Sequence, residues 1–255
     1  MKTPASWSSK IGFILSAAGS AIGLGAIWKF PYTAGTNGGA VFFLLFLLFT
    51  ILIALPVQLA EFYIGRKSGK NAVDAFKVLA PDTLWPWVGR MGVFACFILL
   101  SFYSVVGGWV LNYVVHAFDG SIRAGADFEA LFGNTIASPV GSVAYQGLFM
   151  LMTVWVVKSG ISSGIEKANR YMMPALFILF LLLAGRSLTL PDAMAGVSFL
   201  LKPDWSHLSP QTMLTALGQA FFALSIGVST MITYAAYLDR KQDLFRSGHS
   251  IMWMN

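Results

Sequence analysis

Residues that do chemistry in enzymes are scattered along this 255-residue chain. His116, His207 and His249 lie in separate segments, and the single cysteine, Cys96, lies inside an apolar run. Because no nucleophile–base or metal-ligand spacing connects them, we expect no enzyme activity and no organic cofactor. Polar and glycine residues cluster instead inside two long apolar stretches, where the chemistry they favour is the binding of a small polar solute or an ion.

The first cluster is Ser16-Ala-Ala-Gly-Ser-Ala-Ile-Gly-Leu-Gly25. Glycine costs about 1 kcal/mol relative to alanine in a helix, so three glycines here favour an interruption. Two interpretations stay open from this cluster alone. The pair Gly19-x-x-x-Gly23 has the spacing of close helix packing. Alternatively, the helix unwinds and its exposed backbone groups line a polar site.

The second cluster favours unwinding. It reads Gly218-Gln-Ala-Phe-Phe-Ala-Leu-Ser-Ile-Gly-Val-Ser-Thr230, and two interrupted stretches in one chain point to a site more strongly than one. Freed backbone groups need partners because lipid offers no hydrogen bonds. Half-helix ends carry partial charges, which suit a zwitterion with a cation beside it. Glu61 is an acid within or near an apolar stretch. Placing an acid at membrane depth is costly, so such residues are functional candidates by default. We expect it to accept hydrogen bonds from unwound backbone, with a plain interfacial acid as the alternative.

The composition identifies a membrane protein that crosses the bilayer several times. Hydrophobic residues make up 56% of the chain and charged residues 11%, whereas globular chains carry about 25% charged residues. Too few charges exist to cover a surface in water. A soluble enzyme, a disordered chain and a nucleic-acid binder are therefore poor fits, and we expect a lipid bilayer and no nucleic acid as partners.

Six stretches lack Asp, Glu, Lys and Arg, and a helix needs roughly 20 apolar residues to cross a bilayer. The stretches are 11–28, 30–60, 91–118, 130–157, 171–185 and 208–238. We predict one all-α transmembrane domain over 1–255. Its spans 1 to 6 lie at about 11–34, 40–65, 90–118, 140–158, 166–186 and 211–239, and a seventh span starts at 244–255. Residues 72–79 form an amphipathic segment that we expect on the membrane surface.

The distribution of Lys and Arg between the loops predicts how the chain is oriented in the membrane. With a cytoplasmic N-terminus, the inner segments hold Lys2, Lys10, Arg66, Lys67, Lys70, Lys77, Arg90, Lys158, Lys167, Arg170, Arg240, Lys241 and Arg246. The outer side holds Lys29, Arg123, Arg186 and Lys202. This asymmetry follows the positive-inside rule and predicts a multi-pass protein of the cell (plasma or inner) membrane. A cleaved signal peptide is the alternative for span 1, but its apolar core before 17–21 is short.

Several motifs in order resemble the neurotransmitter:sodium symporters, in particular a bacterial sodium-dependent amino-acid transporter of the leucine-transporter fold. They are Trp7, Gly19-Ser-Ala-Ile-Gly-Leu-Gly25, Trp28-Lys-Phe-Pro31, Asn37-Gly-Gly39, Glu61-x-x-x-Gly65-Arg66, Gly160-Ile-x-x-Gly164-Ile-Glu-Lys167 with Pro174, and Gly218-Gln-x-Phe-Phe222-x-Leu-Ser225. The resemblance implies a first five-helix repeat plus span 6 and the start of span 7, with spans 1 and 6 interrupted. The chain is then expected to be the N-terminal part of a longer protein.

The resemblance also implies roles for individual residues. The substrate site is expected to comprise Ala21, Leu24, Gly25, Leu99, Tyr103, Phe222, Ala223, Ser225 and Val228, with the Tyr103 hydroxyl donating to a carboxylate and Phe222 as a lid. Leu99 and Val228 shape the side-chain pocket. The outer gate is expected at Lys29, Gln219 and Phe222, and the inner gate at Trp7 and Tyr237. Lys29 as a mere interfacial anchor and Tyr103 as an interhelical bond remain the alternatives.

Sodium is the implied coupling ion, at one site rather than two. The second site takes oxygens at Gly19 and Ile22. The first involves Ala21 and Asn255, but Ala26 and Ala223 stand where better-known members carry side-chain oxygens. Losing two oxygens makes the first site doubtful. Gly164 and Pro174 have the spacing that accompanies partial unwinding of span 5, with a simple proline kink as the alternative.

These observations predict a sodium-coupled symporter of an amino acid, with an apolar one favoured, working by alternating access at a midplane site. The resemblance allows a homodimer. A non-transporting truncated fragment, or a regulatory partner of a full-length transporter, is the alternative function. An unrelated channel or membrane scaffold is a third. Sodium-dependent, saturable uptake separates a transporter from a channel, which passes continuous current, and from a fragment, which does neither.

Overall fold

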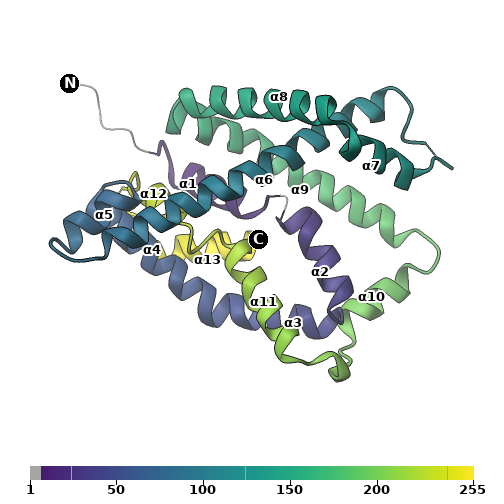
Figure 1. The fold of residues 1–255 in the computed structure, drawn as a ribbon. Helices are drawn as coiled ribbons and strands as arrows, with labels where there is room; N and C mark the ends of the chain where they lie inside the picture. Colours follow the sequence, from purple (N-terminus) through teal and green to yellow (C-terminus); the bar gives the residue numbers. More distant parts are fainter. Residues whose placement is uncertain (1–6, 24, 124, 240) are drawn as a thin grey trace. The chain divides into compact units, whose positions relative to one another are not determined.

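The computed structural model describes residues 7–23, 25–123, 125–239 and 241–255, and the regular elements in these ranges are helices (Figure 1). In chain order they are α1 (Lys10–Ala21), η1 (Gly25–Lys29), α2 (Phe30–Thr36), α3 (Ala40–Phe49), η2 (Thr50–Ala54), α4 (Leu55–Ser68), α5 (Ala72–Leu79), α6 (Pro86–Phe118), α7 (Phe128–Ala137), α8 (Pro139–Lys158), η3 (Ile161–Glu166), α9 (Lys167–Leu188), α10 (Ala193–Leu201), η4 (Trp205–His207), α11 (Pro210–Ala223), α12 (Thr230–Ala235) and α13 (Leu244–Met254). Three of the η segments, η1, η2 and η3, are π-helical.

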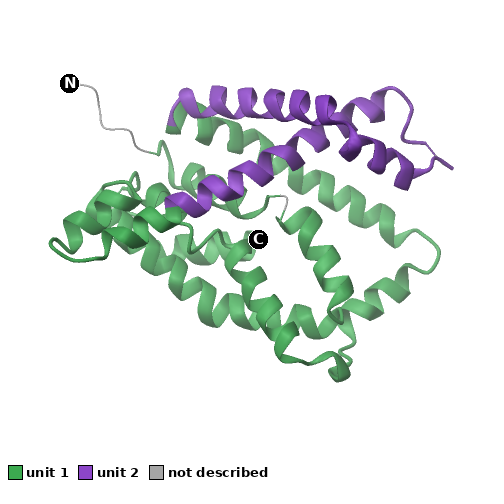
Figure 2. Ribbon diagram, in the orientation of Figure 1, with its two compact units in different colours: residues 1–92, 161–255 green, residues 93–160 purple. Residues whose placement is uncertain are grey.

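The chain divides into two compact units (Figure 2). Unit 1 comprises residues 1–92 and 161–255, and unit 2 comprises residues 93–160. Unit 1 contains both predicted interruptions, so the candidate site is built there.

Four of the described helices are long and apolar enough to cross a membrane by themselves. They are Ala40–Ser68, Pro86–Phe118, Pro139–Lys158 and Ile161–Leu188. Predicted span 1 is a fifth candidate, as two helices, Lys10–Ala21 and Gly25–Thr36, bent by 49°. Predicted span 6 is divided between α11 and α12, which are separated by residues 224–229. Both predicted interruptions are therefore confirmed. Span 5 differs from its prediction, because its helix begins at Ile161 rather than at 166.

The two ends of spans 1 and 2 show that these spans run antiparallel. The rings of Phe13 and Phe62 meet at 5.5 Å between centroids, and both side chains are fully buried. At the other end, Phe30 packs 4.9 Å from Phe46 and 5.7 Å from Phe42. Aromatic pairs at such distances contribute beyond the area they bury. These contacts fix the first hairpin on which the rest of unit 1 packs.

Glycines allow α4 to approach its neighbours closely. A Cβ at Gly65 would overlap the carbonyl oxygen of Ile232 in α12, and a Cβ at Gly248 in α13 would lie 2.7 Å from Leu59. Helices α12 and α13 therefore pack against the same helix. Beyond α4, α5 covers Ala72–Leu79, the predicted amphipathic segment, and its N-terminus is capped by the Asn71 side chain.

Unit 2 consists of most of α6 together with α7 and α8. Its two long helices pack tightly because a Cβ at Gly107 would lie 2.6 Å from the Phe149 ring and one at Gly108 would lie 2.6 Å from the Gln146 nitrogen. The Gln146 side chain donates to Ser104 Oγ at 2.9 Å. Helix α7 is capped at its N-terminus by the Asp127 side chain, which accepts from the Ala130 N–H.

Candidate functional site

The interruption of span 6 has an unusual backbone. Between α11 and α12, Ser225, Gly227 and Ser229 adopt φ values of 53°, 80° and 62°. Serine rarely adopts a positive φ, since its Cβ then crowds the backbone, and such residues persist where the surroundings hold them. The segment is therefore held in its conformation by other parts of unit 1.

Two partners from other spans hold this segment. The Gly227 N–H donates to Glu61 Oε1 at 2.7 Å, and the Ser225 hydroxyl donates to the Ser20 carbonyl oxygen at 2.9 Å. Glu61 belongs to α4 and is 8% exposed. Its other oxygen, Oε2, has no hydrogen-bond partner among the described residues. Glu61 thus accepts a hydrogen bond from unwound backbone, as its position in the sequence predicts.

The interruption of span 1 lies beside that of span 6. Helix α1 ends at Ala21, and the π-helical η1 begins at Gly25. The Phe222 ring lies so close to Gly25 that a Cβ there would overlap it. Gln219 Nε2 donates to the Gly25 carbonyl oxygen at 3.5 Å. With the Ser225–Ser20 bond, these contacts bring the two interrupted spans together, and Gly25 is required for the close approach.

One cation, Lys29 at the end of η1, lies close to this region. Lys29 Nζ lies 4.8 Å from the centroid of the Phe222 ring, which is a cation–π distance. The predicted outer-gate residues therefore occupy one neighbourhood. Lys29 lies over the Phe222 ring, and Gln219 donates to Gly25, against which that ring packs.

The predicted inner-gate residues also meet. Trp7 is 7% exposed, and its indole Nε1–H donates to the Tyr234 carbonyl oxygen at 2.9 Å. Its backbone N–H donates to the Tyr237 carbonyl oxygen at 3.4 Å. The indole ring packs edge-on against Phe13 and Tyr234. The residues preceding α1 are thus fastened to the end of span 6.

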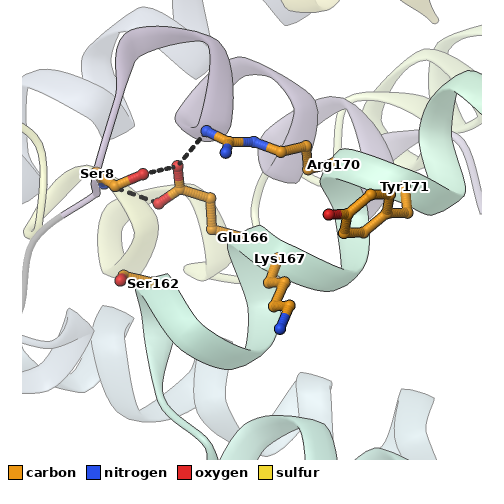
Figure 3. Close-up of a pocket in the computed structure, with 6 residues that line it drawn as sticks. All are labelled: Ser8, Ser162, Glu166, Lys167, Arg170 and Tyr171. Atoms are coloured by element: carbon orange, nitrogen blue, oxygen red, sulfur yellow. Dashed lines mark hydrogen bonds and ion pairs between the residues drawn. The ribbon is translucent and has the colours of Figure 1, made fainter.

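A third polar cluster, which sequence reasoning missed, lies at the start of span 5 (Figure 3). The Glu166 carboxylate is 2% exposed and accepts from the Ser8 N–H at 2.7 Å and the Ser8 hydroxyl at 2.5 Å. Arg170 lies 3.8 Å from the same carboxylate. The available signal was the acid two residues after Gly164, within the Gly160–Lys167 motif, but in the sequence it is typical of the interfacial start of a span.

Glycine packing joins span 1 to span 5. A Cβ at Gly19 would overlap Asn169 Oδ1 and lie 3.2 Å from Met173 Sδ. Gly19 therefore packs closely against span 5, and α1 ends two residues after it, at Ala21. That the backbone beyond α1 lines a polar site stays a prediction. Gly164 lies within the π-helical η3, and Pro174 lies inside α9.

The predicted first sodium site is poor in side-chain oxygens. Ala223 is 3% exposed at the end of α11, and Ala26 lies in η1, so neither supplies one. The Asn255 Oδ1 atom is buried without a hydrogen-bond partner among the described residues. In the same ranges, no group of three His, Cys, Asp or Glu side chains is placed to hold a metal ion. A sodium ion at this place would find no side-chain oxygen at positions 26 and 223.

The remaining predicted site residues stay predictions. Leu24 lies outside the described residues. Leu99 and Tyr103 belong to α6, in unit 2. Val228 lies in the span 6 interruption, beside Ser229.

Comparison with known proteins connects this geometry to a family. Residues 5–125 and 130–255 match the Sodium:neurotransmitter symporter family. The chain is 54% identical, over 99% of its length, to an uncharacterized sodium-dependent transporter of Bacillus subtilis (strain 168), and covers 56% of that protein. It is 36% identical, over 98% of its length, to an uncharacterized sodium-dependent transporter of Methanocaldococcus jannaschii, and covers 52% of it.

Among solved structures, MhsT in complex with L-phenylalanine is similar, with a TM-score of 0.92 and 44% identity. The match covers 98% of this chain and 58% of that one. The chain thus spans about half the length of the curated relatives it matches.

Proposed function

Because the chain belongs to the sodium:neurotransmitter symporter family, we propose that it is part of a sodium-coupled symporter of an apolar amino acid. The observation that carries the proposal is the pair of adjoining interruptions, held together by the Ser225–Ser20 and Gly227–Glu61 hydrogen bonds. Interrupted helices expose backbone groups that can bind a zwitterion and an ion at mid-membrane depth.

The helix ends at the interruptions match the charges of an amino acid. Helices α1 and α11 both end there, and the C-terminal end of a helix carries partial negative charge. Carbonyl oxygens at Ala21 and Ala223 therefore suit a substrate ammonium group and a neighbouring sodium ion. The Tyr103 hydroxyl donates to the substrate carboxylate, and Phe222 covers the site. The similarity to MhsT, solved with L-phenylalanine, supports an apolar substrate that contacts Leu99 and Val228.

One sodium ion is coupled to each substrate. Sodium requires oxygen ligands, and the alanines at 26 and 223 offer none from their side chains. The second site uses backbone oxygens at Gly19 and Ile22, which any side chain leaves in place. Unwinding at Gly164, which Pro174 favours by removing a backbone hydrogen bond, opens that site to the cytoplasm.

Alternating access requires that the inner and outer contacts of span 1 break in turn. The N-terminus lies in the cytoplasm, so Trp7 and Tyr237 close the inner side and Lys29 with Phe222 closes the outer side. Differential affinity of the two states for sodium and substrate couples their movements.

Uptake into proteoliposomes tests the symport. The complete protein is reconstituted, an inward sodium gradient is imposed, and radiolabelled phenylalanine, leucine, glutamate and lysine are compared. We expect saturable uptake of the apolar substrates that disappears when potassium replaces sodium. Uptake that is indifferent to sodium, or restricted to the charged amino acids, contradicts the proposal.

The number of sodium ions has its own measurement. Initial uptake rates against sodium concentration are expected to give a Hill coefficient near 1. The double variant Ala26→Asn/Ala223→Thr restores two side-chain oxygens, and its coefficient is expected to rise toward 2. A coefficient near 2 in the unaltered protein contradicts the single site.

A further inference from the structure

The Glu166 carboxylate at the inner end of unit 1 has no role in the substrate or sodium sites described above. It occupies the last position of the π-helical η3, directly before α9. With 2% of its surface exposed, it is one of the most buried acids among the described residues. Removing a carboxylate from water costs several kcal/mol unless hydrogen bonds replace the lost hydration. The hydrogen-bond partners of Glu166 therefore determine whether η3 can keep this carboxylate buried.

These partners come from the residues just before α1 (Figure 3). The Ser8 N–H donates to Oε2 at 2.7 Å, while the Ser8 and Ser9 hydroxyls donate to Oε1 at 2.5 and 3.3 Å. The Arg170 guanidinium lies 3.8 Å from Oε1, whereas the Lys167 side chain points away from the carboxylate. One acid thus joins segments that are 158 residues apart in the sequence, and most of its donors lie just before α1.

Close packing fixes this arrangement sterically as well. A Cβ at Gly12, in the first turn of α1, would overlap the Glu166 carboxylate. The Ser9 hydroxyl also accepts from the Gly12 N–H at 3.0 Å, so the residue that caps α1 faces the same carboxylate. Close packing at Gly12 and the Ser9 cap therefore fix the position of the Glu166 carboxylate relative to the first turn of α1.

The π-helical turn sets that position. A π-helix holds one residue more per turn than an α-helix, and such turns often occur at functional sites. In an α-helix each residue adds about 100° of rotation, so loss of the extra residue turns Glu166 away from Ser8 and Ser9. Unwinding of 161–166 has the same result.

We propose that Glu166 is a positioning residue that couples the start of span 1 to the start of span 5. Ser8 and Ser9 cannot leave while the carboxylate stays buried, because the charge would lose its donors. Likewise, η3 cannot unwind without withdrawing the acceptor from Ser8. A cavity of about 210 Å³, lined by Ser8, Ser162, Glu166, Lys167, Arg170 and Tyr171, borders the carboxylate, so water can solvate the charge once the contact opens. The two segments therefore open together.

Amide hydrogen exchange on the complete protein in detergent tests this coupling. Glu166→Gln keeps the size of the side chain and removes its charge. We expect exchange to rise about tenfold or more in two segments together, 7–20 and 161–170, since charge-assisted hydrogen bonds are the strong ones. Residues 55–68 and 244–252 are expected to exchange as before. Glu129→Gln, an equal loss of charge in α7, is the matched control and is expected to change neither segment.

Two results overturn the proposal. One is faster exchange in only one of the two segments, which shows that they open independently. The other is an equal rise throughout unit 1, which shows that Glu166 merely supports overall stability. If Glu166→Gln does not fold, Ser8→Ala takes its place, with a smaller rise expected in the same two segments and no rise counting against the coupling. The measurement needs no transport, so failure of the symport leaves it valid, whereas any role in sodium release rests on the proposed function.

Discussion

The two ends of span 1 are held in different ways, and in the proposed orientation the N-terminal end is the inner one and the other end is the outer one. At the inner end, Trp7 and Ser8 donate hydrogen bonds of 2.5 to 2.9 Å from their side chains, and their partners are a backbone carbonyl oxygen and the buried Glu166 carboxylate. At the outer end, Lys29 lies 4.8 Å above the Phe222 ring, and Gln219 donates to Gly25 at 3.5 Å. Short bonds to buried groups are costly to break, whereas a long bond and an exposed cation contribute little.

This difference shows which end resists movement in the described conformation. The inner contacts combine burial, charge and glycine packing, and several donors share the Glu166 carboxylate. The outer contacts involve an exposed lysine that water can solvate at once. Substitutions at the inner end are therefore expected to have larger effects than substitutions at the outer end.

The largest effect is expected where α4 meets α12 on the inner side. Gly65→Ala places a methyl group against the carbonyl oxygen of Ile232, and backbone cannot yield as a flexible side chain does. Overpacking of this kind costs about 1–3 kcal/mol or more. We expect a melting temperature in detergent that is lower by several degrees, or loss of folded protein.

Gly133→Ala in α7 is the control for Gly65→Ala. A Cβ at Gly133 meets nothing within 4 Å, so helix propensity alone predicts a neutral or slightly stabilising change. Equal melting temperatures for the two variants contradict the close approach of α4 and α12.

The next largest effect is expected at Glu61, which accepts a hydrogen bond from the span 6 interruption. Glu61→Gln replaces a carboxylate with an amide opposite the Gly227 N–H and weakens the bond that holds the span 6 interruption. Hydrogen bonds to charged groups contribute about 1.5–3 kcal/mol. We expect the initial rate of sodium-driven uptake to fall at least about tenfold. Uptake at the unaltered rate shows that Glu61 does not support the interruption during transport.

Trp7→Phe tests the hydrogen bond that the Trp7 indole donates at the inner end. Phenylalanine keeps the ring contacts with Phe13 and Tyr234 but loses the N–H that donates to the Tyr234 carbonyl oxygen. One neutral hydrogen bond contributes about 1 kcal/mol. Exchange of the amides in 230–237 is expected to rise about fivefold, and unchanged exchange contradicts a role for the indole N–H in closing the inner end.

Sequence reasoning recovered the helical class and the two interruptions. Hydropathy and glycine clusters carried those predictions, because lipid imposes strict rules on backbone. The gate residues were assigned by the resemblance to the symporter family. The structure places Lys29 beside Phe222 and Trp7 beside Tyr237, and their roles as gates stay predictions. The Glu166 contacts were missed because they join residues about 150 positions apart, and each partner alone resembles an ordinary helix start. The π-helical start of span 5 was missed for a related reason, since one extra residue in a turn leaves the hydrophobic pattern unchanged.

The smallest effect is expected at the outer end. Lys29→Met keeps an unbranched side chain over Phe222 and removes the charge. Exposed cation–π pairs contribute about 0.5–1 kcal/mol, which corresponds to roughly a two- to fivefold rise in the apparent KM for substrate. Lys202→Met removes an equal charge at the exposed C-terminal cap of α10 and is expected to leave KM unchanged. If Lys29→Met instead slows uptake as strongly as Glu61→Gln, the outer contact limits transport and the two ends are equally important.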